Sequence, residues 1–144
     1  MMRYLPDGGQ MKAADTYTIR TLGVPSMVLM ERAALKTVEV MEQSGINLER
    51  ALIACGSGNN GGDGFAIARL LHEKKMRPEI LFAGQEQSLT DECRCQKEID
   101  ERLGIPVFTE IPDREYTVII DAVFGVGLSR EITGHYRSLI DQLN

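Results

Sequence analysis

The chain has 144 residues, of which 43% are hydrophobic and 26% charged, and its formal net charge is −5 at pH 7. These values predict a single globular domain over residues 1–144 and disfavour nucleic acid or an anionic membrane as the main partner. Residues 1–9 contain no apolar core of a secretory signal, and no apolar run approaches the roughly 20 residues that span a bilayer, so we expect a cytoplasmic protein.

Two helices are expected before the first strand. The first covers Gln10–Leu22, and the second covers Met27–Ser44, with Pro25 suited to its first turn and Gly45 to its end. The second helix should bury one face, because its apolar residues recur at helical spacing. These residues are Leu29, Met30, Ala33, Ala34, Val38 and Met41.

From residue 51 onward, strands alternate with helices. This alternation predicts an α/β fold: a doubly wound, mainly parallel, Rossmann-like sheet with helices on both faces, forming a three-layer αβα sandwich. In the common strand order 3-2-1-4, the first and fourth strands are neighbours, and ligands bind where the connections after them diverge. The expected strands are Ala51–Cys55, Glu79–Ala83, Pro106–Phe108 and Tyr116–Ile120, and the expected helices are Phe65–Lys75, Thr90–Leu103 and His135–Leu143.

A glycine-rich run follows the first strand, and its sequence is Gly56-Ser57-Gly58-Asn59-Asn60-Gly61-Gly62-Asp63-Gly64. Because glycine tolerates positive φ and leaves main-chain N–H groups unshielded, the run predicts an anion-binding loop between strand and helix. The run fits the G-x-G-x-x-G pattern, but the second strand ends without the acidic residue that holds a ribose. The Gly-Lys-Ser/Thr of a nucleoside triphosphate loop is absent too. These departures disfavour an ordinary NAD-dependent dehydrogenase and a Walker-type site.

A second loop, Asp121–Glu131, follows the fourth strand and should face the same crevice. Asn60 offers an amide oxygen and Asp121 a carboxylate, which could coordinate a hard cation together with main-chain carbonyls and water. Two residues have alternatives of equal weight. Asp63 could cap the following helix, and Arg130 could pair with a phosphate or be a solvated surface side chain.

The three cysteines indicate reduced thiols. Cys55 ends an apolar strand and is expected in the core, while Cys93 and Cys95 lie in a polar segment. A single Cys-x-Cys pair without further ligands is a poor zinc site, so these two are expected to be surface or half-buried thiols.

Four blocks of the chain together resemble the YjeF N-terminal domain family. They are Met11–Asp15, Gly23–Ala33, Gly56–Gly64 continuing into Leu70, and Asp121–Leu128, in the family's order and spacing. The resemblance implies an isomerase, an NAD(P)H-hydrate epimerase that interconverts the R and S forms of hydrated NADH and NADPH for repair by a partner dehydratase. It also implies a potassium ion as cofactor, a homodimer in many relatives, and a dehydratase that can be fused to the domain.

The resemblance also implies roles for single residues. Asn60 and Asp121 would ligate the potassium ion. The family's catalytic Asp and a Ser of the potassium site belong to an Asp-x-Pro-Ser-Gly segment that follows a position like Asn144, so we expect a chain that is truncated or naturally short at its C-terminal side. Within the chain, Asp63 and Asp121 are the remaining catalytic candidates. The substrate would contact Asn59, Asn60, Gly61, Gly62 and Asp63 from the first loop, and Gly125, Val126, Gly127, Leu128, Ser129, Arg130 and Glu131 from the second.

Two other classes of function compete with the epimerase. One is a non-catalytic nucleotide-binding or scaffold module of the same fold, and the other is a different doubly wound nucleotide binder such as a reductase or a methyltransferase. Retention of the block Asn59–Asp63 and of Asp121 favours the enzyme, since a scaffold needs neither.

Overall fold

The computed structural model describes residues 7–123, which form a parallel four-stranded sheet in the order β3-β2-β1-β4. This is the predicted strand order. The strands are β1 (Ala51–Cys55), β2 (Glu79–Phe82), β3 (Val107–Phe108) and β4 (Val118–Ala122). The helices are α1 (Gly8–Arg20), α2 (Ser26–Gln43), α3 (Asn59–Glu73) and α4 (Asp91–Arg102), with one 3-10 turn, η1 (Glu86–Ser88).

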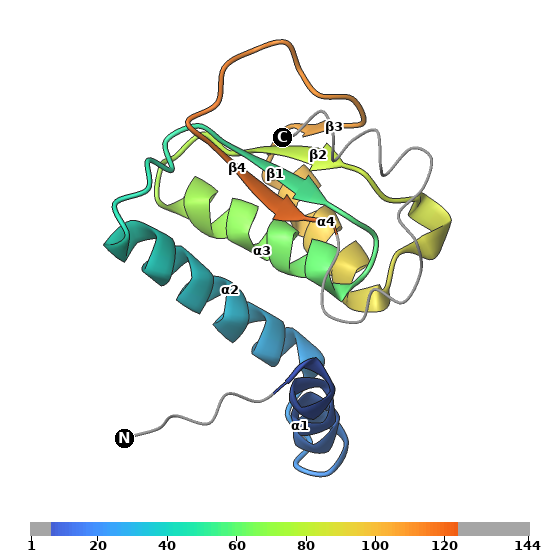
Figure 1. The fold of residues 1–144 in the computed structure, drawn as a ribbon. Coiled ribbons are helices and arrows are strands. Elements are labelled where there is room, and N and C mark those ends of the chain that lie inside the picture. The colour runs from blue at the N-terminus through green and yellow to red at the C-terminus, as the bar shows by residue number, and fades with distance from the viewer. Residues whose placement is uncertain (1–6, 124–144) are drawn as a thin grey trace.

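Three helices form a layer on one face of the sheet. Helix α3 packs against β1, β2 and β4, and it also contacts α2 and α4 (Figure 1). The helix expected over residues 135–143 lies outside the described residues. Within residues 7–123 the fold is therefore the predicted parallel sheet with its first helical layer and the two N-terminal helices.

The core has two parts because side chains of a strand alternate between the faces of the sheet. Under α3, a large cluster joins Ile53 and Cys55 of β1 to Phe65 and Leu71 of α3 and to Ile80 of β2. On the opposite face, a smaller cluster is formed by Leu52, Ala54, Leu81, Ala83 and Val123, with Ile111 and Tyr116 packed against it. All five residues of β1 are buried, which agrees with the central place of that strand.

The helix ends follow the capping signals of the sequence. Asp7 and Gln10 form a capping box at the start of α1, which begins two residues before the predicted Gln10. Pro25 is the N-cap of α2 rather than a residue of its first turn, and Gly45 follows the C-cap with a φ of +74°. Within residues 7–123, none of the helices is long and apolar enough to cross a membrane.

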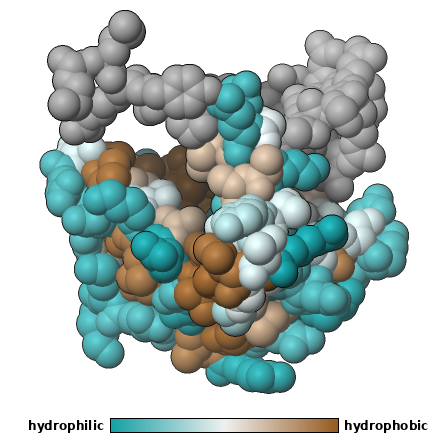
Figure 2. Space-filling view, turned by 90° about the horizontal axis from the view of Figure 1, so that it is seen from below, coloured by the Kyte–Doolittle hydropathy of each residue, from teal (hydrophilic) through white to brown (hydrophobic). Residues whose placement is uncertain are grey.

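The side of the molecule that carries α1 and α2 exposes apolar side chains. Figure 2, seen from below the view of Figure 1, shows brown apolar patches among hydrophilic residues. Only Met30, Ala34 and Val38 of the predicted face of α2 are buried, and within the described chain α1 buries no residue. The exposed large apolar side chains of this region include Met11, Tyr17, Leu22, Val28, Leu35 and Val40.

Candidate functional site

The carboxyl ends of β1 and β4 meet at one edge of the sheet, as the strand order predicts. Ala54 is paired with Asp121, and Cys55 with Ala122, so the residues that follow both strands leave the sheet side by side. The Gly56 N–H donates to the carbonyl of Ala122 at 3.1 Å. The start of the glycine run and the end of β4 are thus in direct contact, at the place where open α/β sheets bind ligands.

The glycine run is mostly helical, which corrects the predicted loop. Helix α3 begins at Asn59, six residues before the predicted Phe65, so only Gly56–Gly58 connect β1 to the helix. Within residues 56–64, no glycine has a positive φ; the positive-φ glycines of the described chain are Gly23, Gly45 and Gly104. Conformational freedom therefore does not explain the run.

Close packing explains these glycines instead. A Cβ placed on Gly61 would lie 1.9 Å from the carbonyl oxygen of Gly56, and one on Gly56 would lie 2.4 Å from the carbonyl oxygen of Val123. A Cβ on Gly64 would lie 2.7 Å from Ala122 Cβ and from Cys55 Sγ. The absence of side chains lets the first turns of α3 sit directly on the ends of β1 and β4. Glycine lowers helix propensity, so the sequence pattern placed the start of the helix after the run.

The N-terminus of α3 has Gly58 as its N-cap, and no side chain of residues 7–123 caps it. The main-chain N–H groups of a first helical turn have no partner in their own helix, and the helix dipole adds a partial positive charge there. This arrangement suits a phosphate group. Asp63 lies inside α3, so the alternative that it caps the helix is wrong.

Thr90 connects the glycine run to the start of α4 through hydrogen bonds. Its main-chain N–H donates to the carbonyl of Ser57 at 3.0 Å, and its hydroxyl donates to Asn59 Oδ1 at 2.8 Å. The same hydroxyl accepts the N–H of Cys93 at 3.2 Å and thereby caps α4. Thr90 was not predicted as a site residue, although its place before an acidic first turn is a helix-start signal.

Asp63, in the glycine run, has a carboxyl group with a raised pKa. Burial raises the pKa of its carboxyl to about 6, and the negative charge of Asp15 on α1 adds to the rise. A carboxyl group with this pKa can hold or release a proton near neutral pH. The influence of Asp15 was not anticipated from the sequence.

We expect Asp15→Asn to lower the pKa of Asp63, because the substitution removes a like charge and leaves burial as the remaining cause of the rise. The measurement is an NMR titration of the Asp63 side-chain carboxyl. Glu98→Gln, which removes an exposed charge from α4, is the matched control and should leave the titration unchanged. Equal titration curves for Asp15→Asn and the parent protein would contradict the coupling between the two carboxylates.

Asp121 lies within β4 and not in the loop after it, because the strand runs from Val118 to Ala122 instead of Tyr116 to Ile120. Its carboxylate is exposed, and Oδ1 accepts the N–H of Val123 at 3.0 Å. The parallel ladder extends two residues further than the apolar pattern predicts, since Asp121 and Ala122 both pair with β1. The residues proposed for the second ligand loop, 125–131, lie outside the described residues.

The oxygen donors at this edge are of the kind that bind a hard cation. Asn60 in the first turn of α3 and Asp121 at the end of β4 both carry hard oxygen ligands. Within residues 7–123, no group of three or more His, Cys, Asp or Glu side chains could hold a metal ion. A cation here would therefore be held by amide, carboxylate and main-chain oxygens.

The cysteines are free thiols in three different settings. Cys55 is buried in the core as predicted, and Cys95 is exposed. Cys93 is fully buried, which contradicts the expected surface or half-buried position. The reason is its place on the inner side of α4, where its Sγ lies 3.5 Å from the carbonyl oxygen of Gly56. Burial raises the pKa of the Cys93 thiol to about 12, so this thiol stays protonated.

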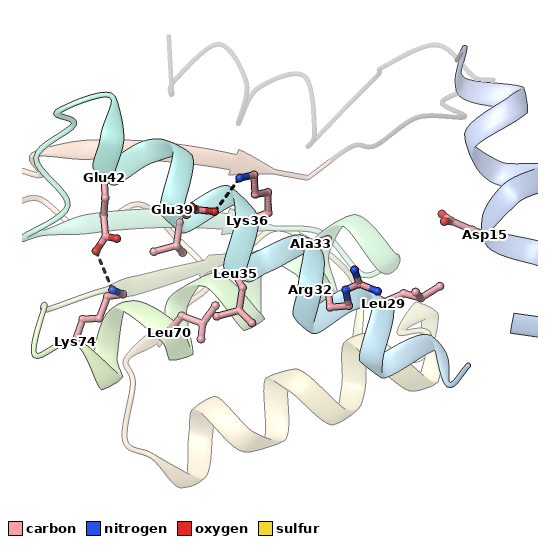
Figure 3. A pocket seen from close by; sticks show the side chains of 11 residues that line it. Asp15, Leu29, Arg32, Ala33, Leu35, Lys36, Glu39, Glu42, Leu70 and Lys74 are labelled. Atoms are coloured by element: carbon pink, nitrogen blue, oxygen red, sulfur yellow. Dashed lines mark hydrogen bonds and ion pairs between the residues drawn. The ribbon is translucent and has the colours of Figure 1, made fainter. Parts of the chain in front are cut away.

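An open groove of about 810 Å³ lies away from the glycine run, between α2, the end of α3 and Asp15 of α1 (Figure 3). Four of its charged side chains form two ion pairs, Lys36 with Glu39 at 2.9 Å and Lys74 with Glu42 at 3.0 Å. None of the predicted substrate or cation ligands lines it. The groove therefore lacks the convergent donors that the edge of β1 and β4 provides.

Comparison with known proteins agrees with this geometry. A family model described as "YjeF-related protein N-terminus" matches residues 26–144. A protein of Oenococcus oeni named NAD(P)H-hydrate epimerase is 46% identical over 90% of this chain, and one of Weissella koreensis with the same name is 43% identical over 94%. The chain spans 63% and 62% of the length of these two curated relatives.

The fold has a solved counterpart. The crystal structure of yeast ynu0, YNL200c, superposes with a TM-score of 0.83 at 19% sequence identity, covering 98% of this chain and 65% of that one. The chain belongs to the YjeF-related protein N-terminus family.

Proposed function

We propose that this chain is the epimerase domain that acts on hydrated NADH and NADPH, interconverting their R and S forms. The relatives that match most of this chain are named NAD(P)H-hydrate epimerase, which supports an isomerase activity. Their names disfavour the alternative of a non-catalytic module with the same fold. The chain covers less than two thirds of these relatives, so the activity of the whole protein is part of the proposal.

The observation that carries the proposal is the direct contact between the glycine run and the end of β4. Gly56 donates to Ala122 and has no room for a Cβ beside Val123, so backbone groups of both segments line one edge of the sheet. A nucleotide needs an anion site and polar groups within a few ångströms of each other. The N-terminus of α3, which no side chain of the described residues caps, supplies the anion site. The side chains of Asn59, Asn60 and Asp63 supply the polar groups.

In the proposed complex, the first turn of α3 binds the nucleotide. Its main-chain N–H groups face a phosphate, and the substrate contacts Asn59, Asn60, Gly61, Gly62 and Asp63. Residues 125–131 would contribute further substrate contacts, as the resemblance implies. A potassium ion would be held by Asn60 and Asp121, and when bound it would supply a fixed positive charge next to the nucleotide.

The chemistry that we propose inverts the carbon that bears the hydroxyl group beside the ring nitrogen. Protonation of that hydroxyl by a general acid lets it leave as water, and the electron pair of the ring nitrogen stabilises the cation that remains. Water then adds from the opposite face and returns a proton to the base, so no net proton or electron is consumed. Asp63, with a pKa raised to about 6, can give and take this proton, and the carboxylate of Asp121 can stabilise the cation.

Two partners belong to the proposal. The epimerase would supply the S form to a dehydratase, which restores the nucleotide. A second copy of the chain would cover the large apolar side chains that α1 and α2 expose, because burying them would favour association. The mass of the particle in solution tests this homodimer.

The test is the conversion of purified R-form hydrated NADPH by the protein, followed by chromatography that separates the two forms. We expect the S form to appear, faster in potassium than in sodium chloride. Asp63→Asn and Asp121→Asn should slow the conversion more than they weaken binding, because both groups act on the reacting carbon or on the ion. If the R form persists as long as it does without protein, the proposed activity is wrong.

A further inference from the structure

We propose that Thr90 is a positioning residue of the nucleotide site, which acts by fixing the orientation of the Asn59 side-chain amide. The geometric argument uses three hydrogen bonds of Thr90, to Ser57, Asn59 and Cys93. The kinetic test of the inference rests on the proposed function.

The hydroxyl of Thr90 has one hydrogen to donate and accepts through its oxygen. The Thr90 hydroxyl oxygen accepts the N–H of Cys93 at 3.2 Å, and the hydroxyl hydrogen is donated to Asn59 Oδ1 at 2.8 Å. With its Oδ1 bound to a donor, the Asn59 amide meets a ligand through its Nδ2–H groups. Thr90 thereby makes Asn59 a hydrogen-bond donor, which suits phosphate and hydroxyl oxygens of a nucleotide.

The main chain of Thr90 binds the residues just before α3. Its N–H donates to Ser57 at 3.0 Å, two residues before Asn59, so both the backbone and the first side chain of α3 are fixed by one residue of α4. The contact spans 31 positions of sequence. Because α4 is anchored by its own buried residues, the orientation of Asn59 exists before a ligand arrives, and preorganised donors bind without the entropy loss of ordering them.

The test compares three substitutions that separate the donor from the helix cap. Thr90→Ser keeps both the hydroxyl donor and the cap of α4. Thr90→Asp keeps a strong cap without a hydrogen to donate at neutral pH, and Thr90→Val removes both. Thr37→Val is the matched control, since it removes a hydroxyl from an exposed position on α2.

We expect Thr90→Val and Thr90→Asp to raise the KM for R-form hydrated NADPH about tenfold with a smaller change in kcat, as the loss of one oriented hydrogen bond implies. Thr90→Ser and Thr37→Val should stay within about twofold of the parent protein. In an Asn59→Ala background, Thr90→Val should have an effect below about twofold, because the side chain through which Thr90 acts is gone. An equal rise in KM in both backgrounds, or a rise with Thr90→Ser as large as with Thr90→Val, overturns the proposal.

A second measurement does not depend on the activity. The side-chain amide resonances of Asn59 in a ¹⁵N–¹H correlation spectrum should shift in Thr90→Val and Thr90→Asp and stay in place in Thr90→Ser. If the parent protein does not convert hydrated NADPH, the proposed function fails while this spectrum still decides the role of Thr90. Unchanged Asn59 resonances in Thr90→Val would show that Thr90 does not orient the amide.

Discussion

Gly61→Ala is expected to destabilise the protein by about 3 kcal/mol and to abolish nucleotide binding, whereas Gly58→Ala should change the free energy of unfolding by less than about 1 kcal/mol. A Cβ on Gly61 would lie 1.9 Å from the carbonyl oxygen of Gly56, and a main-chain atom cannot rotate away. A Cβ on Gly58 meets nothing within 4 Å, and the φ of this residue is −86°. Gly58 is the extended N-cap of α3 and Gly61 lies within the helix, and of the two only Gly61 has a main-chain atom in the place of its Cβ.

Urea unfolding at 25 °C measures the difference, and the two variants serve as controls for each other because both replace a glycine near the start of α3. The expected order is parent protein, then Gly58→Ala close below it, then Gly61→Ala far below. Equal stability of the two variants would mean that α3 does not pack against β1 as closely as the structure indicates.

Asp100→Asn is expected to gain stability over the parent protein as the pH rises. Asp100 is fully buried on α4, and neither carboxylate oxygen has a hydrogen-bond partner within residues 7–123. Burial raises the pKa of its carboxyl to about 8, against a partly compensating attraction from Arg69. The folded protein therefore holds this group as a neutral acid over a pH range in which the unfolded chain ionises it.

The direction of this change in stability with pH follows from the number of protons that each state binds. Below the unfolded pKa of 3.8, both states are protonated and the group has no effect; between 3.8 and about 8, the folded state binds one more proton, so stability falls as pH rises. The slope is about 1.4 kcal/mol per pH unit, so Asp100→Asn should gain about 3 kcal/mol over the parent protein between pH 5 and pH 7. Gln96, one helical turn earlier, offers its unpaired Oε1 to the new amide.

The measurement is the difference in unfolding free energy between variant and parent at pH 5, 6 and 7, which cancels groups common to both. Glu98→Gln, at an exposed position of the same helix, controls for the loss of one negative charge. A difference that stays constant with pH would show that Asp100 is ionised in the folded protein.

Much of the fold follows from the sequence alone. The buried run of β1, the alternation of strands and helices, and the strand order are determined by hydrophobic pattern and by the handedness of crossovers. Apart from the start of α3, the predicted ends of the described helices lie within two residues of the observed ones, as Gly45 shows for α2.

The site was predicted less well, because its geometry depends on contacts between distant segments. The glycines of the run were predicted to form an anion-binding loop, yet most of them lie in α3, where they allow close contacts of Gly61 with Gly56 and of Gly64 with Ala122. Asp121 was placed in a loop because a polar residue ends the apolar pattern, yet pairing with Ala54 keeps it in β4. The bond from Thr90 to Asn59 has no local sequence signal at all.

Titration of the ¹⁵N-labelled protein with hydrated NADPH shows directly whether this nucleotide binds where the glycine run meets the end of β4. We expect the main-chain amide signals of Gly56–Asp63 and of Val123 to shift in proportion to occupancy. The groove of Figure 3 is the internal reference, and signals of Leu29, Lys36 and Leu70 should stay in place. Shifts confined to the groove, with the signals of the glycine run unchanged, would show that the nucleotide does not bind at the end of β4.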